Sequence, residues 1–451
     1  MKININPGHP VNGSLPDSRQ LDLPGDKSLS HRAALFAALA EGESCIENFQ
    51  VSGVTRPLLA ALSQMGVQWQ LEEHSLTIQG RGMAGLQPPA EPIHCGNSAT
   101  TLRLLAGALA AAGIPAVLDG SPGLCRRPME RIVHPLQRMG VPIHAAPGEC
   151  APLTLAARPM QQNLRNIQYT LPVASAQVKS CLLLAALAAD GPSTLFEPGP
   201  SRDHTENMLG SMGVKVTSRR LQNDAGTIYA TQLTPPAAPL KPLRFRLPGD
   251  FSAAAFLIVA TLITPGSQLT LDGVGLNPTR TGLLDALDSM GADLQVQVET
   301  REGGEPAGRI DVRHSQLLAT EISGPLVVRM IDEFPVFAVA AAFAKGTTVV
   351  RQAEELRLKE SNRIAMICQE LTRLGVNIRE TPDGFTVSGA ECPRGGQVEA
   401  HGDHRLAMSL AVAGLACQGP VSVHGAEMTA ESFPNFAAIL QALGADLQLE
   451  D

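Results

Sequence analysis

The chain has 451 residues, 44% hydrophobic and 17% charged, a composition that indicates a folded globular protein with room for two or three domains. Its formal net charge of −8, with one Trp and two Tyr, argues against nucleic acid or an anionic membrane as a partner. No apolar stretch has the roughly 20 residues of a membrane span, Met1–Gly13 is unlike a signal peptide, and no two Cys form a CxxC pair. We therefore expect a cytoplasmic protein without a metal site.

The first segment with chemical interest is Pro24–Arg32, with the sequence PGDKSLSHR. Pro and Gly end a strand, and Asp26 or Ser28 can cap the helix that follows. Lys27 and Arg32 lie near the first turns of that helix. A helix N-terminus has free N–H groups and partial positive charge, so this segment predicts an anion site. Taken alone, it also fits a capped helix with solvated charges.

Other polar segments follow at the expected starts of helices. Gly96–Arg103 (GNSATTLR) is a small-polar turn that lets backbone N–H groups approach a phosphate, although it lacks the Gly-Lys-Ser/Thr ending of a P-loop. Three further segments of this kind are Arg126–Met129 (RRPM), Ser175–Lys179 (SAQVK) and Ser201–Thr205 (SRDHT). Each fits an ordinary helix cap, but together they place polar donors at successive helix starts within one half of the chain.

The second half carries charged segments in apolar surroundings: Ile331–Pro335 (IDEFP), Leu358–Arg363 (LKESNR) and Gly402–Arg405 (GDHR). A carboxylate pressed against apolar residues holds its proton more tightly unless it is paired. Lys359, Glu360 and Arg363 are spaced to fall within one helical turn, which predicts that all three point towards one ligand. The alternative is a plain row of i, i+3 salt bridges.

One pattern organises the whole chain. A Leu-rich helical stretch that ends in Met-Gly or Leu-Gly, followed by a strand-like segment, occurs six times, at Leu58–Val67, Ile132–Val141, Glu206–Val214, Leu283–Ala292, Ile367–Val376 and Ala438–Ala445. The glycine supplies the left-handed residue that ends a helix. The glycines recur every 69 to 84 residues, which suits a βαβαββ unit used six times and is too long for a solenoid of helix pairs.

A longer repeat divides the chain into two halves. The PGDKS of Pro24–Ser28 recurs as PGDFS at Pro248–Ser252, an offset of 224 residues. Phe251 stands where the first copy has Lys27, so capping in this scaffold does not require the charge. We expect a first domain at 21–243 and a second, discontinuous domain made of 1–20 plus 244–451, each with three βαβαββ units.

These segments resemble the enolpyruvyl transferases, in particular the synthases of the shikimate pathway. The matching motifs are PGDKSLSHRA, GNSATTLRLLAG, RRPM, SAQVKS, SRDHTE, IDEFP, LKESNR and GDHR, in the family's order and spread over essentially the whole chain. The resemblance implies an α/β (α+β) fold of two similar domains, each of three βαβαββ units around a pseudo-threefold axis, forming an inside-out α/β barrel. It also implies an active site in the cleft between the domains.

The function implied by the resemblance is transfer of the enolpyruvyl group of phosphoenolpyruvate to the 5-hydroxyl of shikimate 3-phosphate, through a tetrahedral ketal and without a cofactor, in a monomer. The implied ligands of shikimate 3-phosphate are Lys27, Ser28, Arg32, Ser175, Ala176, Gln177, Arg202, Asp332 and Lys359, mainly in the first domain. Those of phosphoenolpyruvate are Lys27, Asn97, Ala99, Arg127, Gln177, Arg363 and Arg405. The implied catalytic residues are Asp332, Glu360 and Lys27; we expect Glu360 to protonate C3 and Asp332 to take the hydroxyl proton, though the sequence leaves the division of protons open.

Three positions depart from the family pattern. Ala99 stands where many members carry Gly, a change associated in the family with poor binding of glyphosate, so we expect glyphosate to be a weak inhibitor. Ser52–Pro57 lacks the acidic residues often found there. Thr429 or Glu431 occupies the region where some members have a substrate-contacting Lys, and we assign no contact there.

Two other functions are consistent with such a scaffold. The related transferase that acts on UDP-N-acetylglucosamine has a reactive Cys five residues before the Arg of its Arg-Pro pair, where this chain has Pro122; Cys125 is only two residues before Arg127. A non-catalytic binder of phosphorylated metabolites would bind ligands without needing Glu360 or Asp332 for any turnover.

Overall fold

The computed structural model describes residues 1–16, 22–159, 162–223, 226–389 and 392–450. The chain forms two compact units. The first unit comprises Gly25–Leu247 and Arg301–Glu305, and the second unit comprises Met1–Pro24, Pro248–Thr300 and Pro306–Asp451. Each unit has one large hydrophobic core of its own.

The described residues form six four-stranded sheets, which share one topology. In β18-β19-β21-β20, for example, the first two strands are parallel and the next pairs are antiparallel. The first unit contains β3 (Glu41–Glu47), β4 (Gln68–Glu72), β5 (Ser75–Arg81), β6 (Ile93–His94), β7 (Ala116–Asp119), β8 (Ile143–Ala146), β9 (Cys150–Leu155), β10 (Gln168–Thr170), β11 (Ser193–Glu197), β12 (Lys215–Asn223), β13 (Gly226–Thr234) and β14 (Arg244–Arg246). The second contains β1 (Lys2–Asn6), β2 (Asn12–Leu15), β15 (Gln268–Gly275), β16 (Asp293–Glu302), β17 (Glu305–Arg313), β18 (Glu321–Ile322), β19 (Gly346–Val350), β20 (Asn377–Thr381), β21 (Gly384–Gly389), β22 (Gly396–Glu399), β23 (Val421–His424) and β24 (Asp446–Glu450).

Each sheet is accompanied by two kinds of helix. Buried helices, apolar on nearly all sides, are α1 (Lys27–Leu39), α3 (Ala99–Ala112), α5 (Ala176–Ala186), α7 (Phe251–Ile263), α10 (Phe334–Ala342) and α12 (His404–Gly414). Helices with one buried face are α2 (Arg56–Gln64), α4 (Glu130–Arg138), α6 (His204–Ser211), α8 (Gly282–Ser289), α11 (Arg363–Arg373) and α13 (Phe436–Ala442). The short helices are α9 (Pro325–Arg329), η1 (Met83–Gly85), η2 (Leu124–Arg126), η3 (Glu354–Leu358) and η4 (Ala426–Glu431).

The six glycines predicted to end helices all have positive φ, between 78° and 107°, and they follow α2, α4, α6, α8, α11 and α13. A residue with a Cβ is strained in this conformation, which is why the repeated Gly marks each helix end. The order of elements in β18, α10, β19, α11, β20, β21 is the predicted βαβαββ unit.

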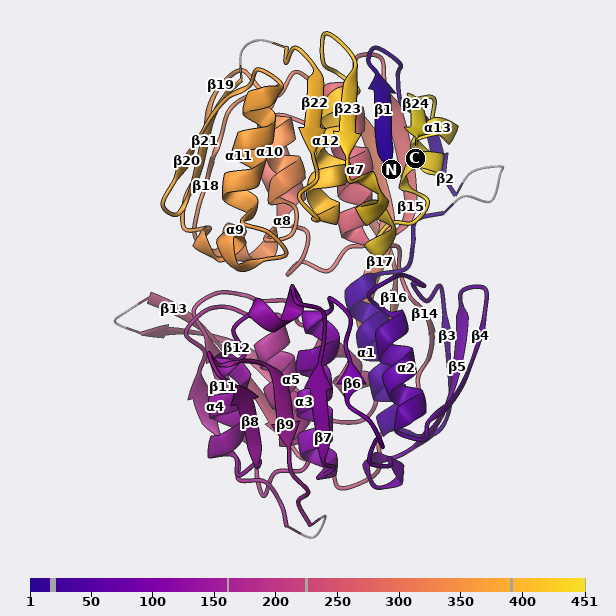
Figure 1. The fold of residues 1–451 in the computed structure, drawn as a ribbon, viewed down its shortest axis with the longest axis vertical. Helices are drawn as coiled ribbons and strands as arrows, with labels where there is room; N and C mark the ends of the chain where they lie inside the picture. The colour runs from indigo at the N-terminus through magenta and orange to yellow at the C-terminus, as the bar shows by residue number, and fades with distance from the viewer. Residues whose placement is uncertain (17–21, 160–161, 224–225, 390–391, 451) are drawn as a thin grey trace. The chain divides into compact units, whose positions relative to one another are not determined.

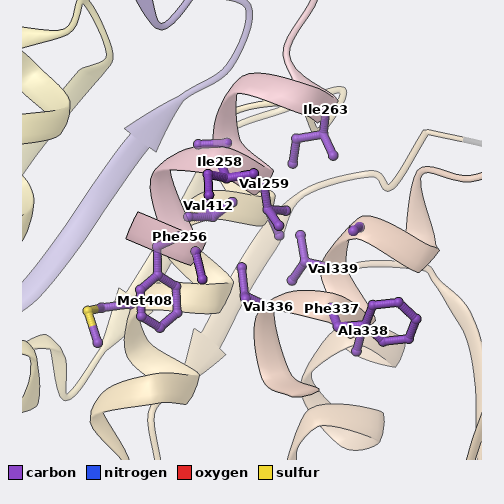
Figure 2. Packing of buried hydrophobic residues seen from close by; sticks show 14 of the residues in the cluster. Phe256, Ile258, Val259, Ile263, Val336, Phe337, Ala338, Val339, Met408 and Val412 are labelled. Carbon is purple, nitrogen blue, oxygen red and sulfur yellow. The ribbon is translucent and has the colours of Figure 1, made fainter. Parts of the chain in front are cut away.

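The core of the second unit is formed where α7, α10 and α12 pack on one another. Figure 2 shows side chains of these three helices, among them Phe256, Val336 and Met408, converging in one apolar cluster. In Figure 1 the same helices lie between the sheet that contains β19–β21 and the sheet that contains β1 and β24. In the first unit, α3 packs on both α1 and α5. Hydrogen bonds join neighbouring helix N-termini in each unit: Gln177 at the start of α5 bonds to Thr100 of α3, and Ser252 at the start of α7 bonds to Glu333, the N-cap of α10.

Strands from distant parts of the chain complete several sheets. β14 pairs in parallel with β3, so the compact first unit runs to Leu247. The boundary predicted from the sequence, after residue 243, therefore comes four residues too early. β1 and β2 pair with β23, β24 and β15, so the start of the chain belongs to the second unit. The tip of the β16–β17 hairpin, Arg301–Glu305, belongs to the first unit. Among the described residues, no helix is both long and apolar enough to cross a membrane.

Candidate active site

Three of the polar segments singled out in the first half of the sequence lie at the N-termini of α1, α3 and α5, while Arg126–Met129 precedes α4 and Ser201–Thr205 leads into α6. Asp26 caps α1, with Oδ1 accepting from the backbone N–H of Leu29 at 2.9 Å. Ser98 and Ser175 cap α3 and α5 in the same way, at 3.1 and 3.4 Å. Because a helix N-terminus favours negative charge, these three ends are the elements of the first unit best suited to hold an anion.

Arg32 is at the centre of a hydrogen-bond network within the first unit. It is 2% exposed, and its Nε and Nη2 donate to Thr205 Oγ1 and Ser180 Oγ, each at 2.8 Å. Its Nη1 donates to the carbonyl of Ser28 at 3.0 Å, and Arg202 Nη1 lies 3.4 Å from Ser28 Oγ. Burial is the largest effect on the pKa of Arg32 and lowers it to about 10, so the group stays charged near neutral pH. Three of the predicted ligands are thus brought together, with Arg32 also tying α1 to α5 and α6.

Gln177 is held in place by Arg103, a residue to which the sequence assigned no role. Arg103 Nη1 donates to Gln177 Oε1 at 2.6 Å, and Gln177 Nε2 donates to Thr100 Oγ1 at 2.9 Å. Arg103 Nη2 also donates to the carbonyl of Pro128 at 3.0 Å. Arg103 therefore connects Gln177 to the segment that follows Arg127.

The remaining predicted ligands of the first unit are accessible to different degrees. Ala99 is the first residue of α3 and is only 3% exposed, while Asn97 Oδ1 accepts from Ser121 Oγ at 2.9 Å. Within the first unit, the half-buried members of the predicted set are Lys27, Ser28, Asn97, Arg127, Ser175, Ala176, Gln177 and Arg202. Side chains with this exposure can reach a bound ligand, whereas Ala99 can act only through the shape of its surroundings.

A buried ion cluster lies beneath the segment that carries Arg202, and sequence reasoning missed it. Lys179 Nζ is 2.8 Å from Glu197 Oε1, 2.7 Å from Glu206 Oε1 and 3.2 Å from the carbonyl of Ser201. Ser201 Oγ donates to Glu197 in turn. Burial opposes the charge on Lys179, but the two carboxylates outweigh burial and hold its pKa above the usual value. The Lys in SAQVK was visible in the sequence, but nothing there showed its partners.

In the described part of the chain, one group of residues brings three potential metal ligands within 4.8 Å of one another, namely Asp203, His204 and Glu305. His204 Nδ1 is 3.0 Å from Glu305 Oε1, and Asn207 Nδ2 donates to the same oxygen at 3.1 Å. Hydrogen bonding accounts for these distances without an ion. The expectation that the protein has no metal site stays a prediction.

In the second unit, Arg363 is surrounded by carboxylates. It is 1% exposed; its Nε donates to Asp403 Oδ2 at 2.9 Å and its Nη2 to Glu360 Oε2 at 2.6 Å. Its Nη1 lies 3.5 Å from Asp332 Oδ1. Burial by itself lowers the pKa of Arg363, but Asp403 and Glu360 outweigh it and hold that pKa above its usual value. Arg363 is therefore a fixed, permanently charged group, and Asp403 orients it.

Arg405 shares the carboxylates of this cluster. Its Nη2 is 3.6 Å from Asp332 Oδ2, and its Nη1 is 3.7 Å from Glu333 Oε1. Its backbone N–H donates to Asp403 Oδ1 at 2.9 Å, which caps α12. The two predicted proton-transfer carboxyls are the more accessible ones, since the side chains of Asp332 and Glu360 are 19% and 22% exposed.

The local structure around Lys359 differs from the sequence expectation. Lys359, Glu360 and Arg363 do not share one helical turn: Lys359 is extended (φ −87°, ψ −153°), and α11 begins only at Arg363. The reason is the side chain of Asn362, which caps the helix by accepting from the N–H of Ala365 at 3.2 Å. Burial is the main influence on Lys359 and lowers its pKa, with Asp332 opposing and Arg363 adding to that effect. Glu360 and Arg363 still form an ion pair, and Lys359 precedes them in the loop before α11.

The second PGD segment lacks a Lys of its own, but in the fold a distant Arg lies beside it. Arg280 is 2% exposed, and its Nη2 donates to Asp250 Oδ1 at 2.6 Å and to Ser252 Oγ at 3.1 Å. Ser252 Oγ donates in turn to Glu333 Oε1. The cation at the start of α7 therefore comes from a residue 30 positions away, and the carboxylates of the chain itself neutralise it.

Comparisons with known proteins agree with this architecture. The model of the family described as EPSP synthase (3-phosphoshikimate 1-carboxyvinyltransferase) matches residues 11–440. The chain is 45% identical to the 3-phosphoshikimate 1-carboxyvinyltransferase of Roseiflexus sp. (strain RS-1) over 98% of both chains, and 43% identical to that of Desulfitobacterium hafniense (strain DSM 10664 / DCB-2) over 98% of this chain and 97% of the relative. A solved EPSP synthase from Acinetobacter baumannii superposes with a TM-score of 0.85 at 38% identity, covering 100% of both chains.

The described residues form two compact units with six βαβαββ repeats, and clusters of Arg, Lys and carboxylates lie at the helix starts. This architecture is that of an enolpyruvyl transferase. Within that class, the chain belongs to the EPSP synthase family. This assignment confirms the family, the fold and the transferase function that the motifs predicted.

Proposed function

We propose that the chain transfers the enolpyruvyl group of phosphoenolpyruvate to the 5-hydroxyl of shikimate 3-phosphate and releases phosphate. The observation that carries the proposal is the second-unit cluster, in which Arg363 and Arg405 stand beside the accessible carboxyls of Asp332 and Glu360. The substrates bring two phosphates and two carboxylates, and Arg is the side chain that best neutralises such groups. The two carboxyls supply the proton transfers that the reaction needs.

We propose that residues of both units contribute to one active site. Shikimate 3-phosphate is assigned to Lys27, Ser28, Arg32, Ser175, Ala176, Gln177 and Arg202, with Asp332 and Lys359. Phosphoenolpyruvate is assigned to Lys27, Asn97, Ala99, Arg127 and Gln177, with Arg363 and Arg405. The capped N-termini of α1, α3 and α5 support the first set, and the fixed charge of Arg363 supports the second.

The proton transfers follow from the carboxyls of the second unit. The 5-hydroxyl oxygen bonds to C2 of phosphoenolpyruvate as Glu360 gives a proton to C3 and Asp332 takes the hydroxyl proton, with Lys27 as a further candidate for proton transfer. The product is a tetrahedral ketal. Phosphate then leaves C2 and takes up the proton held by Asp332, while Glu360 accepts a proton from C3, which restores the double bond as an enol ether. An anionic group of phosphoenolpyruvate at Arg363 weakens the 2.6 Å pair with Glu360 and favours its protonated form, so that substrate binding prepares the acid.

The experiment that tests this function is phosphate release from phosphoenolpyruvate by the purified protein with three acceptor conditions. These are shikimate 3-phosphate, UDP-N-acetylglucosamine and no acceptor. We expect release only with shikimate 3-phosphate. Release with the nucleotide sugar instead would identify the related transferase. Binding of both proposed substrates by calorimetry without any release would make the chain a binder.

Ala99 is expected to weaken inhibition by glyphosate, because its methyl group at the start of α3 takes up space beside Asn97. Ala99→Gly should lower the inhibition constant of glyphosate by at least about tenfold, since one methyl group in a tight site changes binding by about 10- to 200-fold. Ala112→Gly, at the other end of α3, is the control and should leave that constant unchanged. An inhibition constant for the unmodified protein far below the KM for phosphoenolpyruvate would contradict the proposal.

The cytoplasmic location and the monomeric state remain predictions. Cell fractionation and light scattering of the purified protein would check them.

A further inference from the structure

One buried side chain of the first unit has no role in the proposed chemistry. His31 is the fifth residue of α1 and is 2% exposed. Its Nδ1 lies 2.8 Å from the carbonyl oxygen of Lys27, one turn earlier in the same helix. Its Nε2 lies 3.3 Å from Oγ of Ser98, the N-cap of α3. The ring therefore contacts the first turn of α1 and the N-cap of α3.

The hydrogen bonds of Ser98 indicate which ring nitrogen carries the proton. Ser98 Oγ accepts from the N–H of Thr101 at 3.1 Å and from Thr101 Oγ1 at 2.9 Å. Its own O–H is then left to donate, and His31 Nε2 is the acceptor within reach. In that arrangement Nδ1 carries the proton and donates to the carbonyl of Lys27.

The carbonyl of Val54 lies 3.0 Å from Nε2 and would favour a proton on that nitrogen too. Two protons on the ring would make it a cation. Burial, ahead of the charges on Lys27 and Arg32, lowers the pKa of His31 to about 4, so the neutral ring dominates near neutral pH. A neutral ring can bond to Lys27 and Ser98 at once only as the Nδ1–H form.

We propose that neutral His31, protonated on Nδ1, is a positioning residue that holds the first turn of α1 against the N-cap of α3. It thereby sets the spacing between Lys27 and the Asn97–Ala99 segment. The proposal rests on the proposed assignment of those residues to the substrates. His31 itself does not touch a substrate; it acts through the two backbone segments that it joins.

Two substitutions of His31 each keep one of its two hydrogen bonds, to the carbonyl of Lys27 or to Ser98 Oγ. In His31→Asn the side-chain amide nitrogen takes the place of Nδ1, so the bond to Lys27 can persist while the bond to Ser98 is lost. In His31→Gln the side-chain oxygen takes the place of Nε2, so the bond to Ser98 can persist while the bond to Lys27 is lost. We expect the Asn variant to raise the KM for phosphoenolpyruvate about tenfold and to leave that for shikimate 3-phosphate within about twofold. We expect the Gln variant to raise both KM values, because Lys27 is assigned to both substrates.

His314→Asn is the matched control, since His314 Nδ1 also lies 2.8 Å from a backbone carbonyl, that of Leu262 in the second unit. It should change neither KM. If both His31 variants raise both KM values equally, or lower the melting temperature without changing either KM, His31 is only structural and the proposal is wrong. Failure of the proposed function would be recognised separately, as absence of turnover in the unmodified protein.

The protonation state can be tested without substrate. In a ¹⁵N spectrum of histidine-labelled protein, the signals lost in His31→Gln assign the ring among the 11 His of the chain. We expect the pattern of a neutral ring protonated on Nδ1. A neutral ring protonated on Nε2, or a doubly protonated ring at pH 7, would overturn the proposal because neither leaves an acceptor for Ser98.

Discussion

Replacing Glu360 by Gln should lower the rate of phosphate release that depends on shikimate 3-phosphate by about 10²–10⁴-fold. The amide cannot give a proton to C3, but its oxygen can still accept from Arg363 Nη2, which now bonds to Glu360 at 2.6 Å. Substrate binding should therefore survive while turnover is lost. The measurement is single-turnover phosphate release, with dissociation constants for both substrates from calorimetry.

The matched control for this variant is Glu354→Gln, an exposed carboxyl of η3 in the same stretch of chain. It should turn over within about twofold of the unmodified protein, because an exposed surface substitution changes little. A Glu360→Gln variant that retains more than about a third of the rate would show that another group protonates C3. Asp332→Asn is then the next variant to examine.

The features predicted well from the sequence are those that depend only on residues close together in the chain, such as the start or the end of a helix. Each of the six glycines ends its own helix, so a repeated Gly at a fixed place after a Leu-rich stretch is enough to find the repeat. Asp26, Ser98 and Ser175 cap helices that begin one residue later, again a local requirement. The positions of the candidate loops at helix N-termini follow directly from these caps.

The features that sequence reasoning missed are pairs of residues joined only through space. Arg280 reaches Asp250 and Ser252 from 30 and 28 residues away, and Asp403 reaches Arg363 from 40. Neither side of such a pair shows its partner in a single sequence. The helical turn expected at Lys359 is wrong for a related reason: spacing alone could not show that Asn362 caps α11 and leaves Lys359 extended.

Replacing Lys179 by Met should strongly lower the stability of the first unit. Lys179→Met leaves Glu197 and Glu206 buried without their cation, and both carboxylates are at most 7% exposed. Removing one member of a buried ion cluster typically costs about 3–5 kcal/mol. We expect a loss of this size in the free energy of unfolding of the first unit, measured by denaturant titration. Because the chain has two units, the titration must resolve two transitions.

Two controls separate loss of the charge from loss of the side chain. Lys215→Met, which removes an exposed Lys from β12, should change stability by no more than about 0.5 kcal/mol. The triple variant Lys179→Met, Glu197→Gln and Glu206→Met removes every charge of the cluster and should be more stable than Lys179→Met alone. A triple variant as unstable as the single one would show that packing of the Lys stem, rather than charge, is what the cluster contributes.

The pH dependence of Lys179→Met gives an independent check. Burial is the largest influence on Glu206 and already raises its pKa above the ordinary value of 4.5, and loss of Lys179 removes the main opposing effect. A carboxyl whose pKa is higher in the folded state than in the unfolded state stabilises the fold below the unfolded value, and this contribution is lost as pH rises through the folded value. The stability difference between Lys179→Met and the unmodified protein should therefore be largest near neutral pH and shrink as the pH falls towards about 4.5. A difference independent of pH would mean that the buried carboxylates are not the source of the instability.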